Sequence, residues 1–258
     1  MLLAVDVGNT QSHVGVFEER ELVAHWRFAT EADDTADELA VRVSALVALG
    51  GLKLGDLDGS IVSSVVPQLT PEYADMSNRY LDDGCLIVGP GVRTGMAIRL
   101  DNPLELGADR LVNAVAAYER FGGPCAVVDF GTAITFDAVS AEGEYLGGVI
   151  GPGVEISMEA LAARAAKLPA VELGEPLGEP GGVIGKTTQA SLQSGIVYGF
   201  AGAIDAIARR VQRELGDEAE FIATGGHAPA IIPFCEMIDE VDDLLTLTGL
   251  RLIWEQNG

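Results

Sequence analysis

The stretch LAVDVGNTQSHVGV, residues 3–16, has a counterpart later in the chain, AVVDFGTAITFDAV, residues 126–139. In each copy an apolar run ends at an aspartate, a glycine follows two positions later, and a second alternating run begins. Such alternation predicts a strand, a tight turn and a second strand. Because the copies lie close to half a chain length apart, the repeat predicts two similar domains. Ligands commonly bind between domains, so we expect the two aspartate turns to face one cleft.

Around these two segments, expected strands alternate with expected helices, which indicates an α/β fold. Strands are expected at about residues 2–7, 12–17, 22–28, 60–66, 85–88, 125–130, 133–139, 145–149 and 220–224. Thr35 and Glu38 have the spacing of a capping box that opens a helix ending at Gly50. Further helices are expected near residues 71–81, 109–121, 155–167 and 188–215. Residues 169–183 are rich in Pro, Gly and Glu, which predicts an exposed loop. The repeat places the domains at residues 1–115 and 116–258.

The composition excludes several classes of protein. Of the 258 residues, 48% are hydrophobic and 21% are charged, which is typical of a folded globular protein. The formal net charge of −23 argues against nucleic acid and against an anionic membrane as partners, because phosphate groups attract Lys and Arg. ATP stays possible, since Mg²⁺ and backbone N–H groups can hold a triphosphate in an acidic protein.

We expect neither a membrane-spanning segment nor a signal peptide in this sequence. No apolar stretch approaches the roughly 18 residues needed to cross a bilayer, and no basic segment precedes the first apolar run. The three cysteines, Cys85, Cys125 and Cys235, are odd in number and lack metal-ligand spacing. They suit a reducing compartment, so we expect a cytoplasmic protein.

The first aspartate turn has the side chains of a phosphate site. Gly8 lets the backbone bend and approach phosphate oxygens, and Asn9, Thr10 and Ser12 add neutral donors. A carboxylate beside them would repel phosphate unless a cation lay between, so Asp6 indicates Mg²⁺. The alternative is a hairpin whose aspartate caps its own turn. The second copy of the turn favours the phosphate site.

A second candidate lies in DNPLELGADRLVNAVAAYERFGG, residues 101–123. Apolar residues recur here at helical spacing and place Asp109 and Arg110 at a helix start. Asp109 could be a simple N-cap. It could instead be a general base, with Arg110 beside it to bind a substrate carboxylate. His13, His25 and His227 are too scattered to indicate a metal site, although His13 lies in the phosphate turn.

These residues together resemble the type III pantothenate kinase family, which belongs to the superfamily of acetate kinase, sugar kinases, heat-shock ATPases and actin. The matching motifs are DVGNT (6–10), SSVVP (63–67), DNPLELGADR (101–110), DFGTA (129–133), GGVIGPG (147–153), IGKTTQASLQSG (184–195), ATGG (223–226) and LTLTGL (245–250). The order of GADR, DFGTA and IGK-x-T is the specific part. The resemblance implies two duplicated ribonuclease H-like domains and an ATP-dependent enzyme that phosphorylates the terminal hydroxyl of pantothenate, the first step towards coenzyme A.

The resemblance also implies roles for single residues. Asp109 would accept the proton of the attacking hydroxyl, and Asp6 would lie near Mg²⁺. Asp129 would bind a monovalent cation, K⁺ or NH₄⁺. The residues that would contact ATP are Asp6, Val7, Gly8, Asn9, Thr10, Gln11, Ser12, His13 and Thr132. Those that would contact pantothenate are Leu100, Gly107, Ala108, Asp109, Arg110 and Thr188. The family forms homodimers, and the helix at residues 188–215 is a candidate interface.

Two positions depart from the family pattern. Leu100 stands where a tyrosine is usual, which would remove a hydroxyl contact to pantothenate, and His227 stands where a smaller or apolar residue is usual. Two alternative functions are another small-molecule kinase of the superfamily and a nucleotide-binding regulatory protein. The retained Asp6, Asp109 and Asp129 favour catalysis, because a pure binding module needs no base.

Overall fold

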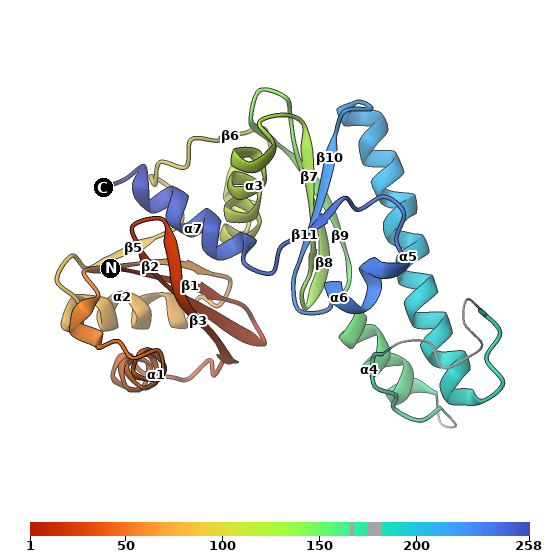
Figure 1. The fold of residues 1–258 in the computed structure, drawn as a ribbon, viewed down its shortest axis with the longest axis horizontal. Helices are drawn as coiled ribbons and strands as arrows, with labels where there is room; N and C mark the ends of the chain where they lie inside the picture. Colours follow the sequence, from red (N-terminus) through yellow and green to blue (C-terminus); the bar gives the residue numbers. More distant parts are fainter. Residues whose placement is uncertain (166–167, 175–181) are drawn as a thin grey trace. The chain divides into compact units, whose positions relative to one another are not determined.

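The computed structural model describes residues 1–165, 168–174 and 182–258. The chain folds into two compact units, both visible in Figure 1. Unit 1 comprises Met1–Met96, Asp101–Ala116 and Leu244–Gly258. Unit 2 comprises Ala97–Leu100 and Ala117–Asp243. Each unit is an α/β structure built on one mixed sheet.

The sheet of unit 1 has the strand order β3-β2-β1-β4-β5. Its strands are β1 (Leu2–Val7), β2 (Gln11–Glu18), β3 (Glu21–Ala29), β4 (Gly59–Ser64) and β5 (Cys85–Ile87). The strand β1 is antiparallel to β2 and parallel to β4. Leu3, Val5 and Val7 of β1 point to one face and join a buried core there. The alternation therefore leaves Asp6 on the opposite face.

Helices cover both faces of this sheet (Figure 1). On the core face lie α1 (Ala36–Leu49) and α2 (Leu69–Tyr80), and α1 opens with the expected capping box. The Glu38 N–H donates to Thr35 Oγ1 over 3.4 Å, and the Thr35 N–H donates to Glu38 Oε2 over 2.9 Å. On the other face lies α7 (Leu245–Glu255), where a Cβ added to Gly15 would meet the Leu247 side chain. The helix α3 (Ala108–Phe121) begins in this unit.

Unit 2 has a sheet of order β11-β10-β7-β8-β9-β6. Its strands are β6 (Ala97–Ile98), β7 (Cys125–Phe130), β8 (Ala133–Val139), β9 (Glu144–Pro152), β10 (Glu220–Thr224) and β11 (Glu240–Val241). Its helices are α4 (Val154–Arg164), α5 (Thr188–Leu215) and α6 (Ala228–Ile231). The helix α5 supplies Val197, Ala201, Ile204 and Ala208 to the core against β7, β8 and β10.

The two sheets confirm the duplication. The order β3-β2-β1-β4-β5 of unit 1 is matched by β9-β8-β7-β10-β11 of unit 2. In both, the central strand is antiparallel to the next strand in sequence and parallel to the strand that follows a crossover. This is the two-domain α/β architecture that the sequence and the family resemblance predict.

Several details differ from the sequence-based expectation. The helix α7 packs in unit 1, whereas the expected domain division assigned residues 116–258 to one domain. The helices α6 and α7, the short strands β6 and β11 and the 3₁₀ turns Leu54–Asp56, Pro103–Glu105 and Ile232–Phe234 were not anticipated. The helix expected at residues 155–167 ends at Arg164, and residues 166–167 lie outside the described part.

The loop expected at residues 169–183 is only partly described. Residues 175–181 lie outside the described part, and those on either side form neither helix nor strand. Within the described ranges, no helix is both long enough and apolar enough to cross a bilayer.

Candidate active site

The first aspartate turn joins β1 to β2. The Gly8 N–H donates to the Gln11 carbonyl over 3.1 Å, and a Cβ on Gly8 would lie 2.9 Å from that same oxygen. The turn therefore has no room for a larger residue at position 8. Asn9 and Thr10 are exposed at the tip, and Asp6 is partly buried at the end of β1. The tip leaves polar side chains accessible to a bound ligand.

Beneath the tip, the hydroxyl groups of Ser12, which is buried, and Thr30, which is partly buried, support the turn. The Ser12 and Thr30 hydroxyl oxygens lie 2.9 Å apart, and the Thr30 N–H donates to the Thr10 carbonyl over 3.0 Å. The Tyr73 hydroxyl is buried near Ser12 and makes no hydrogen bond within the protein. Burial raises the pKa of Tyr73 to about 12. Ser12 therefore supports the turn from its core side, rather than presenting its hydroxyl at the exposed tip.

His13 is buried and lies opposite Asp6 on β1 and opposite Arg27 on β3. Its Nε2 lies 3.2 Å from Nδ1 of His25. Burial, and then the positive charge of Arg27, lowers the pKa of His13 to about 3. His13 is therefore neutral at neutral pH in this structure.

The start of α3 presents the candidate base. Asp109 lies in the first helical turn, and its Oδ1 is buried without a hydrogen-bond partner. Burial raises the pKa of Asp109 above its usual value, while the backbone N–H and the charge of Arg110 oppose the rise. A Cβ on Gly107 would lie 2.5 Å from Oδ1, so the carboxylate packs directly on the glycine backbone. Asp109 is thus a carboxylate with one oxygen that is desolvated and makes no hydrogen bond within the protein.

The second aspartate turn, between β7 and β8, is enclosed by glycines. The Gly131 N–H donates to the Ala133 carbonyl over 3.1 Å. A Cβ on Gly153 would lie 2.2 Å from the Thr132 carbonyl oxygen, and one on Gly225 would lie 2.5 Å from Asp129 Oδ1. Gly225 also has a φ of +95°, which favours glycine. Both glycines let backbone approach the turn closely, and the sequence analysis did not identify this role for Gly153.

The remaining predicted substrate residues lie in different settings. Ala108 opens α3 in unit 1, next to Asp109 and Arg110, while Leu100 and Thr188 belong to unit 2. Leu100 Cδ2 would lie 3.5 Å from a Cβ on Gly147. Thr188 is exposed at the first position of α5, behind the N-cap Thr187, whose side chain accepts from the Ala190 N–H over 3.1 Å. The structure thus groups the Asp6 turn and the Asp109 helix start in unit 1, and Asp129, Thr132 and Thr188 in unit 2.

The donor set suits Mg²⁺ bound together with a nucleotide. The described residues hold no cluster of three or more His, Cys, Asp or Glu side chains able to cage a metal. Mg²⁺ at phosphate sites commonly takes one or two carboxylates, phosphate oxygens and water rather than a complete protein cage. A single carboxylate such as Asp6 beside a tight glycine turn fits that pattern.

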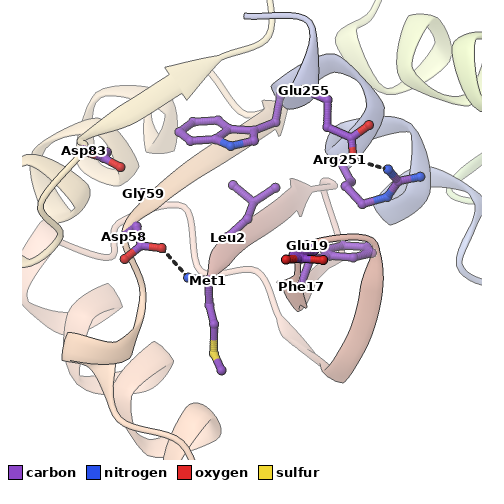
Figure 2. A pocket seen from close by; sticks show the side chains of 10 residues that line it. Met1, Leu2, Phe17, Glu19, Asp58, Gly59, Asp83, Arg251 and Glu255 are labelled. Atoms are coloured by element: carbon purple, nitrogen blue, oxygen red, sulfur yellow. Dashed lines mark hydrogen bonds and ion pairs between the residues drawn. The ribbon is translucent and has the colours of Figure 1, made fainter. Parts of the chain in front are cut away.

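Unit 1 also contains a separate cavity of about 280 Å³, shown in Figure 2. Leu2, Phe17 and Trp254 supply its apolar lining. Two ion pairs lie at its rim, from the amino group of Met1 to Asp58 and from Arg251 to Glu255. The cavity lies at the start of β1, whereas the aspartate turn follows the end of that strand, so the two are distinct.

Comparisons with known proteins identify relatives of the whole chain. A family model described as type III pantothenate kinase matches residues 2–210. A type III pantothenate kinase of Moorella thermoacetica is 51% identical over 257 residues, and the match covers 100% of this chain and 100% of the relative. One of Streptomyces avermitilis is 51% identical over 265 residues, covering 100% of this chain and 98% of the relative.

Solved structures support the fold. A structure described as a conserved putative Baf family transcriptional activator from Campylobacter jejuni superposes with a TM-score of 0.61 at 19% identity, covering 99% of this chain and 98% of that one. A putative 2-dehydro-3-deoxygalactonokinase from Sinorhizobium meliloti also reaches 0.61, at 13% identity, with coverages of 99% and 96%. A ROK hexokinase from Thermus thermophilus reaches 0.54 at 14% identity, with coverages of 100% and 99%. At these identities the likeness concerns the fold alone.

Proposed function

Because the chain belongs to the type III pantothenate kinase family, we propose that it transfers the γ-phosphate of ATP to the terminal hydroxyl of pantothenate. The observation that carries this proposal is the state of Asp109. Its Oδ1 is buried, has no hydrogen-bond partner and belongs to a carboxyl group whose pKa is raised. A group with an available, basic oxygen at a helix start is suited to accept a proton from an alcohol.

In the proposed mechanism Asp109 orients the attacking hydroxyl and takes up its proton as the new bond to phosphorus forms. The Arg110 backbone N–H helps to hold the carboxylate. Phosphoryl transfer depends mainly on positioning and charge neutralisation, so the base is needed when the hydroxyl proton becomes acidic. The desolvated oxygen is more basic than an exposed aspartate, which favours that transfer.

The Asp6 turn is the proposed site for the ATP phosphates. Backbone N–H groups and the side chains of Asn9 and Thr10 at the exposed tip would donate to phosphate oxygens. Asp6 would hold Mg²⁺ directly or through water, and the bound metal would neutralise charge on the phosphates. His13, neutral because of its lowered pKa, would contribute a hydrogen bond and no charge.

We assign the monovalent cation, K⁺ or NH₄⁺, to Asp129, and a contact with ATP to Thr132 on the same turn. Hard cations prefer oxygen ligands, and the close approach of Gly225 to Asp129 Oδ1 brings backbone near the carboxylate. The cation would then lie at the turn that the duplication relates to the Asp6 turn.

In unit 1, pantothenate would be held by Gly107, Ala108 and Arg110, while the roles of Thr188 and Leu100 in unit 2 rest on the family resemblance alone. Successive helical residues point about 100° apart. Asp109 and Arg110 can therefore direct a carboxylate and a guanidinium to different parts of one substrate. Arg110 would pair with the pantothenate carboxylate, which a guanidinium recognises through two parallel hydrogen bonds.

We also propose that the protein is a homodimer that uses α5. A cavity of about 440 Å³ lies along α4 and α5, lined by Leu161, Leu192, Ile196 and Phe200 among others. Gly195 and Gly199 also line it, and a Cβ at either would meet nothing within 4 Å. An apolar hollow of this kind suits an interface in which a second copy supplies the missing side chains. The net charge of −23 argues against nucleic acid as a partner. Three free cysteines agree with the cytoplasm as the proposed location.

The proposal is tested by measuring ADP release with ATP and Mg²⁺, with and without pantothenate, in K⁺ and in Na⁺. We expect release that requires pantothenate and is faster in K⁺. Release that another small alcohol supports and pantothenate does not would refute the substrate assignment. Equal rates in K⁺ and Na⁺ would refute the cation role of Asp129 alone.

A further inference from the structure

Ser63 lies beside the magnesium aspartate in the sheet of unit 1. The parallel register of β1 and β4 pairs Asp6 with Ser63. Registered residues on neighbouring strands project to the same face, and such strands lie about 4.8 Å apart. Val62, which precedes Ser63, joins the core on the α1 and α2 side. Ser63 therefore shares with Asp6 the opposite face.

The Ser63 hydroxyl lacks a partner that other buried serines have. Ser63 is fully buried, and its Oγ has no hydrogen-bond partner in the protein. The other buried serines of unit 1 are all paired: Ser60 and Ser77 oxygens lie 2.6 Å apart, and Ser12 lies 2.9 Å from Thr30. Buried polar groups are nearly always hydrogen-bonded, so the Ser63 hydroxyl needs a partner from outside the chain, either an ordered water or a group of a bound ligand.

The internal duplication repeats the position of this residue. In unit 2, the parallel register of β7 and β10 pairs Asp129 with Thr224. Thr224 is 2% exposed and carries the same kind of group, a hydroxyl. Each turn aspartate thus has a buried hydroxyl residue at the same register on the adjacent parallel strand. The recurrence concerns the position of the hydroxyl; of the two residues, only Ser63 has a buried oxygen without a hydrogen-bond partner.

We propose that the Ser63 hydroxyl hydrogen-bonds a water molecule bound to the Mg²⁺ of the Asp6 site; this inference rests on the proposed function. Mg²⁺ loses its water reluctantly and usually keeps several water ligands beside a nucleotide. Partners of such ligands orient them and raise the affinity for the metal. A neutral hydroxyl does so without adding a negative charge close to the phosphates. Ser63 is therefore a positioning residue for Mg²⁺–ATP.

The test compares Ser63→Ala with Ser60→Ala in the full chain. Both residues are fully buried serines of β4, but Ser60 lies on the core face and its hydroxyl is paired. Binding of a non-hydrolysable ATP analogue is measured by calorimetry with Mg²⁺ and with EDTA, and stability by urea unfolding. Ser63→Thr, which keeps the hydroxyl, serves as the rescue variant.

We expect Ser63→Ala to weaken analogue binding roughly 10-fold in Mg²⁺, to leave binding in EDTA unchanged and to leave the unfolding midpoint unchanged or higher. Ser60→Ala should lower the unfolding midpoint but bind the analogue as much more tightly in Mg²⁺ than in EDTA as the wild type does. Ser63→Thr should keep most of this gain in affinity from Mg²⁺.

Equal weakening of analogue binding by Ser63→Ala in Mg²⁺ and in EDTA would show a direct nucleotide contact and overturn the proposal. If Ser63→Ala lowers the unfolding midpoint and still binds the analogue more tightly in Mg²⁺ to the same degree as the wild type, Ser63 has a structural role and the proposal is overturned as well. A wild-type protein that binds the analogue no better with Mg²⁺ would instead contradict the proposed function itself.

Discussion

At the scale of single residues, Asp109 combines two properties that lower stability and suit the role of base proposed for it. Its carboxylate is desolvated, and one oxygen has no partner in the protein. A buried charge without full compensation lowers the free energy of unfolding. The same desolvation makes the group a better base. The fold therefore tolerates an unfavourable carboxylate at the position where the proposed reaction needs one.

Because burial of the Asp109 carboxylate is unfavourable, Asp109→Asn should increase stability to an extent that depends on pH. The pKa of Asp109 is higher in the folded protein, so its contribution to stability is greatest below the unfolded pKa and falls as pH rises through the folded pKa. At neutral pH the asparagine variant should therefore unfold at a higher temperature than the wild type. Below about pH 4 the advantage should vanish, because Asp109 is then protonated in both states. Melting temperatures across this range check the prediction, and a variant less stable than the wild type at neutral pH would contradict it.

Asp6 and Asp109 are candidates from the sequence because each stands at a position that a local pattern marks, the end of an apolar run and the start of a helix. The sequence does not identify Ser63 as a separate candidate, although Ser63 belongs to the quoted SSVVP segment. Its meaning depends on the register between β1 and β4, which are far apart in the chain. The sequence also does not predict that His13 is neutral, because its low pKa results from burial and from the neighbours Arg27 and His25 in the folded protein.

At the scale of elements, α7 shows why one helix went unanticipated. No side chain caps its start, and its first turns contain Thr246, Thr248 and Gly249, which favour helix poorly. Tertiary contacts stabilise it instead: the Thr246 Oγ1 lies 2.7 Å from Asn113 Oδ1, and Leu245, Leu247, Leu250 and Ile253 are buried. The strands β6 and β11 have two residues each, too short for any periodicity to appear.

Gly249 provides a test of this packing. A Cβ there would lie 2.2 Å from the Val112 carbonyl oxygen of α3. We expect Gly249→Ala to lower the free energy of unfolding by about 1–3 kcal/mol through overpacking, although alanine favours helix. The matched control is Gly202→Ala in α5, where an added Cβ meets nothing within 4 Å. That control should gain about 0.5–1 kcal/mol. Urea unfolding of both variants decides, and a stabilising Gly249→Ala would refute the close contact of α7 with α3.

At the scale of the whole molecule, the repeat in the sequence predicted two similar units, and the structure shows that they share a strand order. The repeat did not predict that the chain returns to unit 1 at Leu244. A duplication is most simply interpreted as two domains, each formed by one continuous stretch of the chain. The apolar face of α7 does not indicate which of the two sheets the helix will cover. The contacts of α7 with β1 and β4 decide that question.

The proposed homodimer makes a prediction about assembly. Gly199→Glu places a charged side chain in the apolar hollow along α5, where no atom of the same subunit lies within 4 Å of the new Cβ. We expect the wild type to sediment as a dimer and this variant as a folded monomer. Gly55→Glu, at another open glycine in unit 1, should remain dimeric. A Gly199→Glu protein that stays dimeric would exclude this face as the interface.

The most direct measurement of the central claim compares the rates of pantothenate-dependent ADP formation by the wild type and Asp109→Asn at saturating Mg²⁺–ATP. Loss of a general base typically slows a reaction by about 10²–10⁴-fold. We predict a fall of that size, with nucleotide binding intact and a folded variant. Turnover of Asp109→Asn equal to that of the wild type would contradict the assignment of Asp109 as the base and, with it, the mechanism proposed for this kinase.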